Sequence, residues 1–264
     1  NGANKLAGTI LKNPAFAATM RQIAKGGADA FYTGPIAESI VFAVRDAKRN
    51  KGGMTLIDLA NYRAVKRRPI CANYRTKLVC GMGPPSSGGL STLQILGLLS
   101  GFNMKNITPA SLEAVHLLGE AGALAFADRN AYVGDSDFVN VPTKEMIDGG
   151  YLKRRAKEIN IRRAGGRRKA GEPSTLGAQR LSPHEGYEGL STTHLSVIDA
   201  NGNAVSMTSS VENAFGSRQM ASGFILNNQL TDFSFRPTQN GHDIANRVTA
   251  GKRPRSSMSP TLVF

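Results

Sequence analysis

The first half of the chain carries apolar residues at three- and four-residue steps, the periodicity of helices with one buried face. Four segments have this pattern: residues 4–27, 36–50, 90–102 and 111–135. A short helix is predicted after Thr55, because Thr55 and Asp58 have a spacing close to that of a capping box. The N-terminal half is therefore predicted to be rich in helices.

Strand patterns interrupt and then follow these helices. Residues 69–82 alternate as in a strand, and the Pro, Ser and Gly residues of 83–89 end it. In 194–211 β-branched residues alternate around Asn-Gly-Asn, a strong signal for a hairpin with a two-residue turn. Further strands are predicted in 222–235 and 252–264. Helices first and strands later indicate an α+β fold.

Length and composition are those of a globular protein. The chain has 264 residues, of which 41% are hydrophobic and 20% charged, enough for one large domain or two small ones. No apolar run approaches the length of a membrane span, and no signal peptide is visible at the start. The chain opens on Asn1 without a Met, so we expect a piece of a longer protein, whose targeting segment could be lost.

The formal net charge of +14 suggests a nucleic-acid partner, but much of that charge is local. Nine of the 33 basic residues lie in 153–174, where Gly, Pro and Ser accompany few apolar residues. We predict that this segment is a solvated, mobile connector. Because it adjoins no zinc finger, aromatic RNA platform or helix-turn-helix, nucleic-acid binding is disfavoured.

The two cysteines and four histidines give little sign of a metal site. Cys71 and Cys80 lack CxxC spacing, and we expect two buried free thiols, although one bridge between neighbouring strands stays possible. The histidines are scattered without HExxH spacing, so no metal is expected. No GxGxxG, P-loop or GxSxG motif is present, and no cofactor is expected.

Hydroxyl residues gather at the predicted hairpin. Ser191 and Thr192 directly precede its first strand, and Ser210 lies on the returning one. A threonine acts as a nucleophile when its own α-amine serves as the base, which requires a chain cut immediately before it. The alternative is a Thr-rich edge strand without chemistry.

Five motifs carry a resemblance to a known family: TTHLSVIDANGNAVSMTSSVENAFGS, GFILNNQLTDFS, KRPRSSMSPT, PPSSGG and ADRNAYVGDSDFV. Together they resemble the γ-glutamyltransferase (γ-glutamyltranspeptidase) family of N-terminal nucleophile hydrolases, over essentially the whole chain. The resemblance implies an αββα four-layer sandwich, incomplete in this chain. It also implies a precursor cut into two subunits. Residues 1–191 would belong to the large one, with a basic linker at about 153–191, and 192–264 to the small one.

The resemblance assigns the chemistry to Thr192. Its hydroxyl would cut the Ser191–Thr192 bond, and in the mature enzyme it would form an acyl-enzyme with glutathione or a related γ-glutamyl amide. Water, or the amine of an amino acid or peptide, would then resolve the acyl-enzyme. Ser210 would support the nucleophile's amine, and His194 would pack or hydrogen-bond beside it. The family likeness also implies a periplasmic or secreted protein.

Substrate contacts are carried over in the same way. Glu212 would contact the α-amino end of the substrate, and Gln229 and Asp232 would bind its ammonium group. Ser256 and Ser257 would hydrogen-bond the α-carboxylate. Each has a plain alternative: Asp232 as a turn cap, the serines as loop residues. PPSSGG is expected mainly to form a strand-to-helix turn.

The chain also departs from the family pattern. Members are about twice as long, and the expected N-terminal arginine and C-terminal Gly-Gly oxyanion hole are missing, so we expect no efficient catalysis from this chain alone. Residues 233–255 are short and contain no Tyr, which predicts an open site that accepts larger acyl donors. Two rival functions stay open: a cephalosporin- or glutaryl-type acylase on the same scaffold, and a catalytically silent basic binding protein.

Overall fold

A computed structural model describes residues 5–173 and 191–264, and the contacts divide the chain into two compact units. Unit 1 comprises Asn1–Val65 and Val211–Asn228, and unit 2 comprises Lys66–Ser210 and Gln229–Phe264. This division follows packing density, so it is independent of the subunit boundary predicted at residue 191. Among the described residues, no helix combines the length and apolarity needed to cross a membrane.

Unit 1 is a small helical layer with one short hairpin. Its elements are α1 (Pro14–Gly26), α2 (Asp29–Tyr32), α3 (Gly34–Arg45), α4 (Leu56–Ala60), β5 (Met220–Ala221) and β6 (Phe224–Ile225). The helix predicted over 4–27 begins only at Pro14, because the Asn13 side chain caps it at the Phe16 amide. The predicted capping box is confirmed, since Thr55 and Asp58 each bond the other's backbone N–H. Ile36 and Ile40 of α3 form the core with Ala221.

The sheet of unit 2 has the order β1-β2-β9 and is antiparallel throughout. Its strands are β1 (Ile70–Tyr74), β2 (Lys77–Gly81) and β9 (Thr261–Val263). The single strand predicted over 69–82 is therefore a hairpin. Arg75 takes a φ of 56° at the turn, a conformation that favours Gly or Asn, so the sequence carried no turn signal there.

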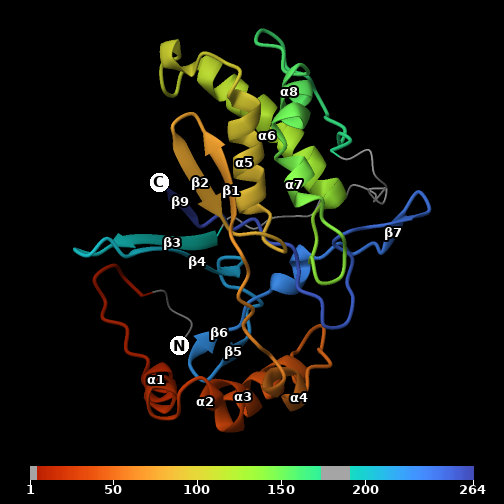
Figure 1. Cartoon of the computed structure of the whole chain (residues 1–264). Helices are drawn as coiled ribbons and strands as arrows, with labels where there is room; N and C mark the ends of the chain where they lie inside the picture. The colour runs from red at the N-terminus through yellow and green to blue at the C-terminus, as the bar shows by residue number, and fades with distance from the viewer. Residues whose placement is uncertain (1–4, 174–190) are drawn as a thin grey trace. The chain divides into compact units, whose positions relative to one another are not determined.

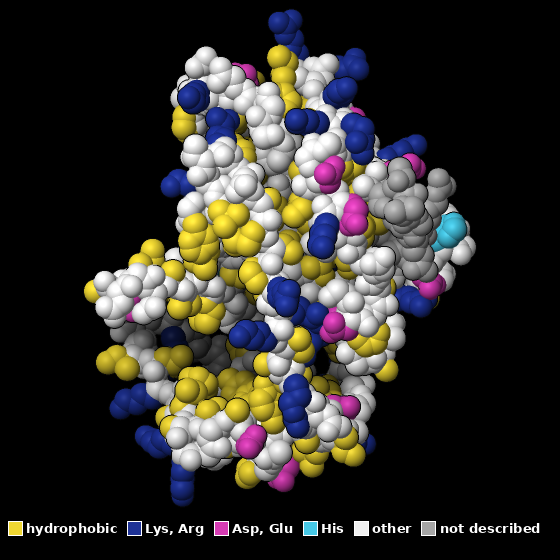
Figure 2. Space-filling model, viewed as in Figure 1, with side chains coloured by type: hydrophobic (Ala, Val, Ile, Leu, Met, Phe, Trp, Pro, Cys, Tyr) yellow, Lys and Arg dark blue, Asp and Glu magenta, His cyan; other side chains and the backbone are white. Residues whose placement is uncertain are grey.

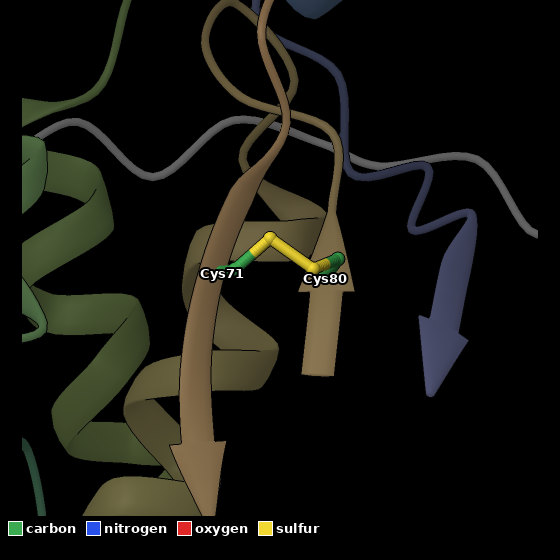
Figure 3. The surroundings of a disulfide bond; sticks show 2 residues. All are labelled: Cys71 and Cys80. Carbon is green, nitrogen blue, oxygen red and sulfur yellow. A yellow bond between two sulfur atoms is a disulfide. The ribbon is translucent and has the colours of Figure 1, made fainter. Parts of the chain in front are cut away.

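The expectation of two free thiols is wrong. Cys71 and Cys80 form a disulfide, and they are directly opposite each other in the β1–β2 register (Figure 3). Once the segment folds back at Arg75, the two Cα atoms lie 4.1 Å apart and the sulfur atoms can bond, which the nine-residue spacing alone does not reveal. The bridge therefore fastens together the two strands that lead into the PPSSGG segment.

Helices cover this sheet on one side. They are α5 (Gly88–Leu99), α6 (Leu112–Tyr132), α7 (Thr143–Met146) and α8 (Gly149–Ala156), with the 3-10 turn η1 (Met104–Asn106) before α6. Figure 1 shows α5 against β1 and β2, and α6 and α8 pack against α5 in turn. Leu98, Leu117, Leu124 and Leu152 are almost fully buried between these helices. The helices predicted at 90–102 and 111–135 are thus confirmed with small shifts at their ends.

The basic segment differs from the predicted mobile connector. Residues 153–156 complete α8, and Arg155 is buried in an ion pair with Asp128. Further along, the Gly171 amide donates to Asp128 Oδ1 at 2.8 Å, and Arg168 pairs with Glu120. Buried carboxylates of α6 therefore hold 165–171 in place, whereas Lys153, Arg154 and Lys157 are exposed. Figure 2 shows Lys and Arg side chains scattered over the visible face of the molecule. The rest of the predicted linker, 174–190, lies outside the described residues.

The predicted hairpin is confirmed as β3 (Ser191–Ile198) and β4 (Ala204–Glu212), but its turn has three residues instead of two. The Asp199 amide donates to the Asn203 carbonyl at 3.0 Å and closes the loop. The Asp199 carboxylate accepts the Asn201 and Asn203 amides at 2.9 and 2.8 Å. The Gly202 amide donates to the Asp199 carbonyl at 3.1 Å, and Gly202 has a φ of 83°. The β-turn is therefore centred on Ala200 and Asn201, one residue earlier than a turn centred on Asn-Gly.

The two C-terminal strand predictions are largely wrong. In 222–235 the chain forms only β6 before the 3-10 turn η2 (Gln229–Asp232), because Gly223 (φ 84°) folds β6 straight back onto β5. In 252–264 only the last residues are strand, since 255–259 bind the PPSSGG segment instead of a strand neighbour. A two-residue hairpin, β7 (Thr238–Gln239) with β8 (His242–Asp243), lies between them.

Candidate active site

The start of the β3–β4 hairpin carries the predicted nucleophile. Thr192 is the second residue of β3, one position after Ser191, and its side chain is exposed. Its Oγ1 donates to Ser210 Oγ on β4 at 3.3 Å. The structure therefore places the two hydroxyls together at the open end of the hairpin. A cut before Thr192 would remove one residue from the strand and keep this pair.

A row of polar side chains continues along the same hairpin. The His194 ring lies 2.8 Å (Nδ1) from Thr208 Oγ1 and 3.2 Å (Nε2) from Ser196 Oγ. The Ser206 hydroxyl is 3.4 Å from the same Nε2 and accepts the Thr261 amide of β9 at 3.0 Å. His194 is thus a hydrogen-bonding residue, as predicted, although it is exposed instead of packed. The shortest of these contacts joins the ring to Thr208 on β4.

Gln229 and Asp232 form the two ends of η2 in unit 2. The Gln229 Nε2 amide reaches the Ser210 carbonyl at 3.4 Å, so it adjoins the Thr192–Ser210 pair through the backbone of β4. The Asp232 carbonyl accepts Asn246 Nδ2 at 2.6 Å, which holds the end of the turn and leaves the carboxylate partly exposed. Gln229 is therefore a predicted substrate residue that is hydrogen-bonded to a member of the hydroxyl pair, Ser210.

Glu212 ends β4 in unit 1. Its side chain accepts the Asn228 Nδ2 amide, the residue is only 6% exposed, and its φ is 71°. A buried carboxylate on a left-handed, non-glycine residue is an unusual combination, and such backbone strain concentrates at functional sites. Glu212 therefore stays a candidate substrate residue.

Ser256 and Ser257 lie in a segment that is bound on one side by the PPSSGG motif. The Ser256 carbonyl accepts both the Ser87 amide at 2.7 Å and the Ser87 hydroxyl at 2.8 Å. The Ser86 hydroxyl donates to the Met258 carbonyl at 2.7 Å. The serine pair is therefore held by its backbone, and the PPSSGG motif does more than turn a strand into a helix.

Glycine is required where α5 begins against this segment. A Cβ at Gly88 would lie 2.4 Å from the Met258 carbonyl oxygen, and one at Gly89 would lie 2.5 Å from the Met82 carbonyl oxygen. Neither backbone can move away without loosening the serine pair or strand β2. The two glycines of PPSSGG are thus explained by close backbone approach.

Arg129 of α6 is a site residue that the sequence analysis did not assign. It is 3% exposed, and its Nε donates to Ser87 Oγ at 2.9 Å and its Nη2 to Ser257 Oγ at 2.5 Å. The signal was present, because Arg129 lies within the quoted motif ADRNAYVGDSDFV and interrupts an apolar run. Only the meeting of three distant segments gives it a function.

The structure brings the predicted residues into two sets in unit 2. Thr192, Ser210 and Gln229 form one, and Ser256 and Ser257 form the other. Across residues 5–173 and 191–264, no hydrogen bond joins Thr192 to either serine of the second set. The same described residues contain no group of three His, Cys, Asp or Glu side chains that could hold a metal ion.

An exposed hydroxyl at the start of a strand, in a mixed fold of helices and sheets, fits the class of N-terminal nucleophile hydrolases. Comparison with known proteins supports this class. The family model described as gamma-glutamyltranspeptidase matches residues 1–264. The chain therefore belongs to the γ-glutamyltranspeptidase family.

Individual relatives agree. The chain is 41% identical over 263 residues to the glutathione hydrolase proenzyme of Escherichia coli K12, covering 97% of this chain and 43% of that protein. It is 39% identical over 272 residues to the glutathione hydrolase proenzyme of Bacillus subtilis subsp. natto, covering 100% of this chain and 45% of that protein. The chain thus spans less than half the length of these relatives.

Among solved structures, the chain resembles a cephalosporin acylase from Bacillus halodurans with a TM-score of 0.74 and 29% identity. The likeness covers 97% of this chain and 42% of the acylase chain. The fold is therefore shared by glutathione hydrolases and acylases, and the choice between them depends on the site.

Proposed function

We propose that the protein containing this chain is a self-processing γ-glutamyl hydrolase and transpeptidase with Thr192 as nucleophile. The observation that carries the proposal is the exposed Thr192 hydroxyl at the start of β3, bonded to Ser210 at 3.3 Å, in a chain of this family. The substrates are glutathione and related γ-glutamyl amides, and the acceptors are water or the amine of an amino acid or peptide.

Self-processing begins at the Ser191–Thr192 bond. Thr192 Oγ attacks the Ser191 carbonyl carbon, and the peptide C–N bond breaks as the nitrogen takes up a proton. The product is an ester between Ser191 and Thr192, which water hydrolyses. Ser210 accepts the hydrogen bond of the Thr192 hydroxyl beforehand and so orients its oxygen. The cut frees the α-amine of Thr192, which has a pKa near neutrality and serves as the base for the mature reaction.

In the mature enzyme the same oxygen attacks the γ-glutamyl carbonyl carbon. The leaving amine takes the proton that the Thr192 α-amine has accepted, and an acyl-enzyme forms. Water or an acceptor amine then attacks the ester and restores the Thr192 hydroxyl. Gln229, Asp232 and Glu212 read the ammonium group of the substrate, and the serine pair reads its carboxylate. Opposite charges read at opposite ends suit an amino-acid head group.

The same proposal covers the assembly and its location. The whole protein would be an αββα sandwich of two subunits from one precursor, with residues 1–191 in the large subunit and 192–264 in the small one. A periplasmic or secreted location is supported by the Cys71–Cys80 disulfide, because such bonds persist in oxidising compartments.

An acylase for cephalosporin or glutaryl side chains is the second candidate, favoured by the likeness to the Bacillus halodurans acylase. A glutaryl group lacks the α-ammonium, so release of p-nitroaniline from γ-glutamyl- and glutaryl-p-nitroanilide separates the two. Loss of charge-assisted hydrogen bonds costs about 1.5–3 kcal/mol, so we expect at least tenfold faster γ-glutamyl release. Equal rates would contradict the head-group assignment, and faster glutaryl release would establish the acylase.

Thr192→Ala serves as the control in this comparison, because both enzymes require the Thr192 hydroxyl. Activity that survives this substitution would contradict the nucleophile. If the wild type lacks both activities but is retained on DNA in a salt-dependent manner, the silent basic binding protein would replace both candidates.

A further inference from the structure

The hydroxyl groups of Ser256 and Ser257 each accept a hydrogen bond from the protein. Ser257 Oγ accepts from Arg129 Nη2 at 2.5 Å, and Ser256 Oγ accepts from the Met258 amide at 3.2 Å. A serine hydroxyl has one proton to donate and two lone pairs to accept with. Within the described part of the chain, neither hydroxyl proton is donated to a protein acceptor. Both protons are therefore available to an anion.

Arg129 supports the two serines from the interior of the protein. It projects from α6, is almost fully buried, and bonds two hydroxyls through two different guanidinium nitrogens. The first of these hydroxyls, that of Ser87, donates a hydrogen bond to the Ser256 carbonyl at 2.8 Å. One guanidinium thus contacts the Ser257 side chain directly and supports the Ser256 backbone through Ser87.

Exposure separates the supporting residue from the surface that would meet a ligand. Arg129 is 3% exposed and Ser87 1% exposed, whereas Ser257 is exposed and Ser256 partly so. A ligand therefore meets the serines and not the arginine. The arginine acts on a ligand only by orienting the hydroxyl in front of it and by its positive charge.

We propose that Arg129 is a positioning residue for the α-carboxylate of the substrate. By filling a lone pair of Ser257, it turns that hydroxyl proton outward, and its charge strengthens the hydroxyl as a donor to an anion. This inference deepens the proposed function and rests on it, because the ligand is the carboxylate of a γ-glutamyl group. The buried Arg129–Ser87–Ser257 cluster is thus the inner half of a carboxylate site.

Arginine suits this position better than lysine. Its planar fork holds Nε and Nη2 at a fixed separation and angle, so both serines are bonded at once. A lysine has a single nitrogen on a flexible stem, and keeps the charge without the fixed geometry. The contribution of charge and that of geometry can therefore be separated by substitution.

The test compares two substrates of the whole protein, γ-glutamyl-p-nitroanilide and 4-aminobutyryl-p-nitroanilide. The second is the first without its α-carboxylate. The ratio of their kcat/KM values measures recognition of that carboxylate, and a merely structural defect lowers both values together. We expect Arg129→Met to lower the ratio at least tenfold, mainly through a higher KM for the γ-glutamyl substrate. Arg129→Lys should lie between Arg129→Met and the wild type.

The matched control is Thr92→Ala. Thr92 also joins α5 to the same loop, 3.1 Å from Ser259 Oγ, but it does not touch the serine pair. Its ratio should equal that of the wild type. If Thr92→Ala lowers the ratio as much as Arg129→Met does, the effect is general loosening of the loop, and the proposal is wrong.

A double substitution tests whether Arg129 acts through Ser257. In a Ser257→Ala background, Arg129→Met should lower the ratio little further, because the hydroxyl that it orients is gone. Fully additive losses would overturn the positioning role. Should Arg129→Met fail to fold, Arg129→Lys and Ser87→Ala give the same comparison with smaller changes of volume.

The outcomes also separate this inference from the proposed function. If the wild type releases p-nitroaniline from neither substrate, the proposed function fails. If it cleaves both substrates equally, the carboxylate site and the role of Arg129 are wrong, and the nucleophile is unaffected. If the wild type shows the preference and the ratio is unchanged in Arg129→Met and Arg129→Lys, only the role of Arg129 is refuted.

Discussion

Removing the charge of Asp128 should destabilise the chain more than removing that of Glu158, although both carboxylates pair with Arg155. Asp128 Oδ1 lies 3.1 Å from Arg155 Nη2, whereas Glu158 Oε1 lies closer to Nη1, at 2.6 Å. By distance alone the Glu158 ion pair would be the stronger one, but burial makes the Asp128 ion pair contribute more to stability. The Asp128 side chain is 2% exposed and the Glu158 side chain 44% exposed, so water replaces only the second partner.

The bonds to Asp128 set the magnitude. Besides Arg155, its carboxylate accepts the Tyr151 hydroxyl at 2.6 Å, the Gln94 amide at 3.1 Å and the Gly171 amide at 2.8 Å. Desolvation and the Asp128 charge both raise the pKa of Tyr151, so its hydroxyl stays a donor. Asp128→Asn removes the buried counter-charge of Arg155 and leaves only the half-exposed Glu158, which costs about 3–5 kcal/mol. Glu158→Gln should cost about 0.2–1 kcal/mol.

Thermal unfolding of the two variants measures the difference. At about 2–4 °C per kcal/mol, Asp128→Asn should lower Tm by roughly 6 to 20 °C, and Glu158→Gln by at most a few degrees. Hydrogen exchange should also accelerate at the Gly171 amide, which loses a charged acceptor. Equal Tm losses in the two variants would refute the argument from burial, and a larger loss in Glu158→Gln would show that distance decides.

Three further predictions follow from other contacts. Reduction of the Cys71–Cys80 bridge, or its replacement by two serines, should remove about 2.6 kcal/mol of loop-closure stabilisation, and thiol titration of the unreduced chain should find no free cysteine. Asp199→Ala should slow appearance of the cleaved fragment on gels, because the turn of the hairpin loses its acceptor. The Asn203 side chain and neighbouring backbone amides lower the pKa of Asp199. The stabilisation of the turn by the Asp199 carboxylate is therefore present above about pH 4 and is lost as the pH falls through the lowered pKa. Hairpin chemical shifts that stay unchanged below that pKa would contradict this prediction. Gly88→Ala should weaken γ-glutamyl turnover, whereas Gly119→Ala, whose Cβ would meet open space, should not.

The helices of this chain could be predicted because their signals are local. Apolar periodicity located α5 and α6, and the Thr55–Asp58 spacing located α4 with its capping box. Asn-Gly located the β3–β4 hairpin, and the family resemblance assigned Thr192 and Ser210, which lie together at its open end. Each of these features depends on residues close in the sequence.

The features that were missed depend on distant or unmarked residues. The disulfide requires the fold-back at Arg75, where no Gly or Asn gives warning. The ordering of 165–171 requires carboxylates from α6, some 45 residues earlier. Arg129 could be proposed as a positioning residue only from the structure, in which it bonds Ser87 of PPSSGG and Ser257 of the serine pair. Local pattern therefore located the hairpin, the family resemblance singled out Thr192 within it, and the residues that support the candidate carboxylate site became visible only in the fold.

The N-terminal residue of the small fragment, in a preparation of the whole protein, tests most directly whether Thr192 is the nucleophile. If Thr192 is the nucleophile, the wild-type fragment begins at Thr192. In Thr192→Ala this fragment is absent, and the intact mass is that of the uncut chain. A wild-type chain that stays uncut, or a fragment that begins at another residue and persists in Thr192→Ala, would show that Thr192 is not the self-processing nucleophile.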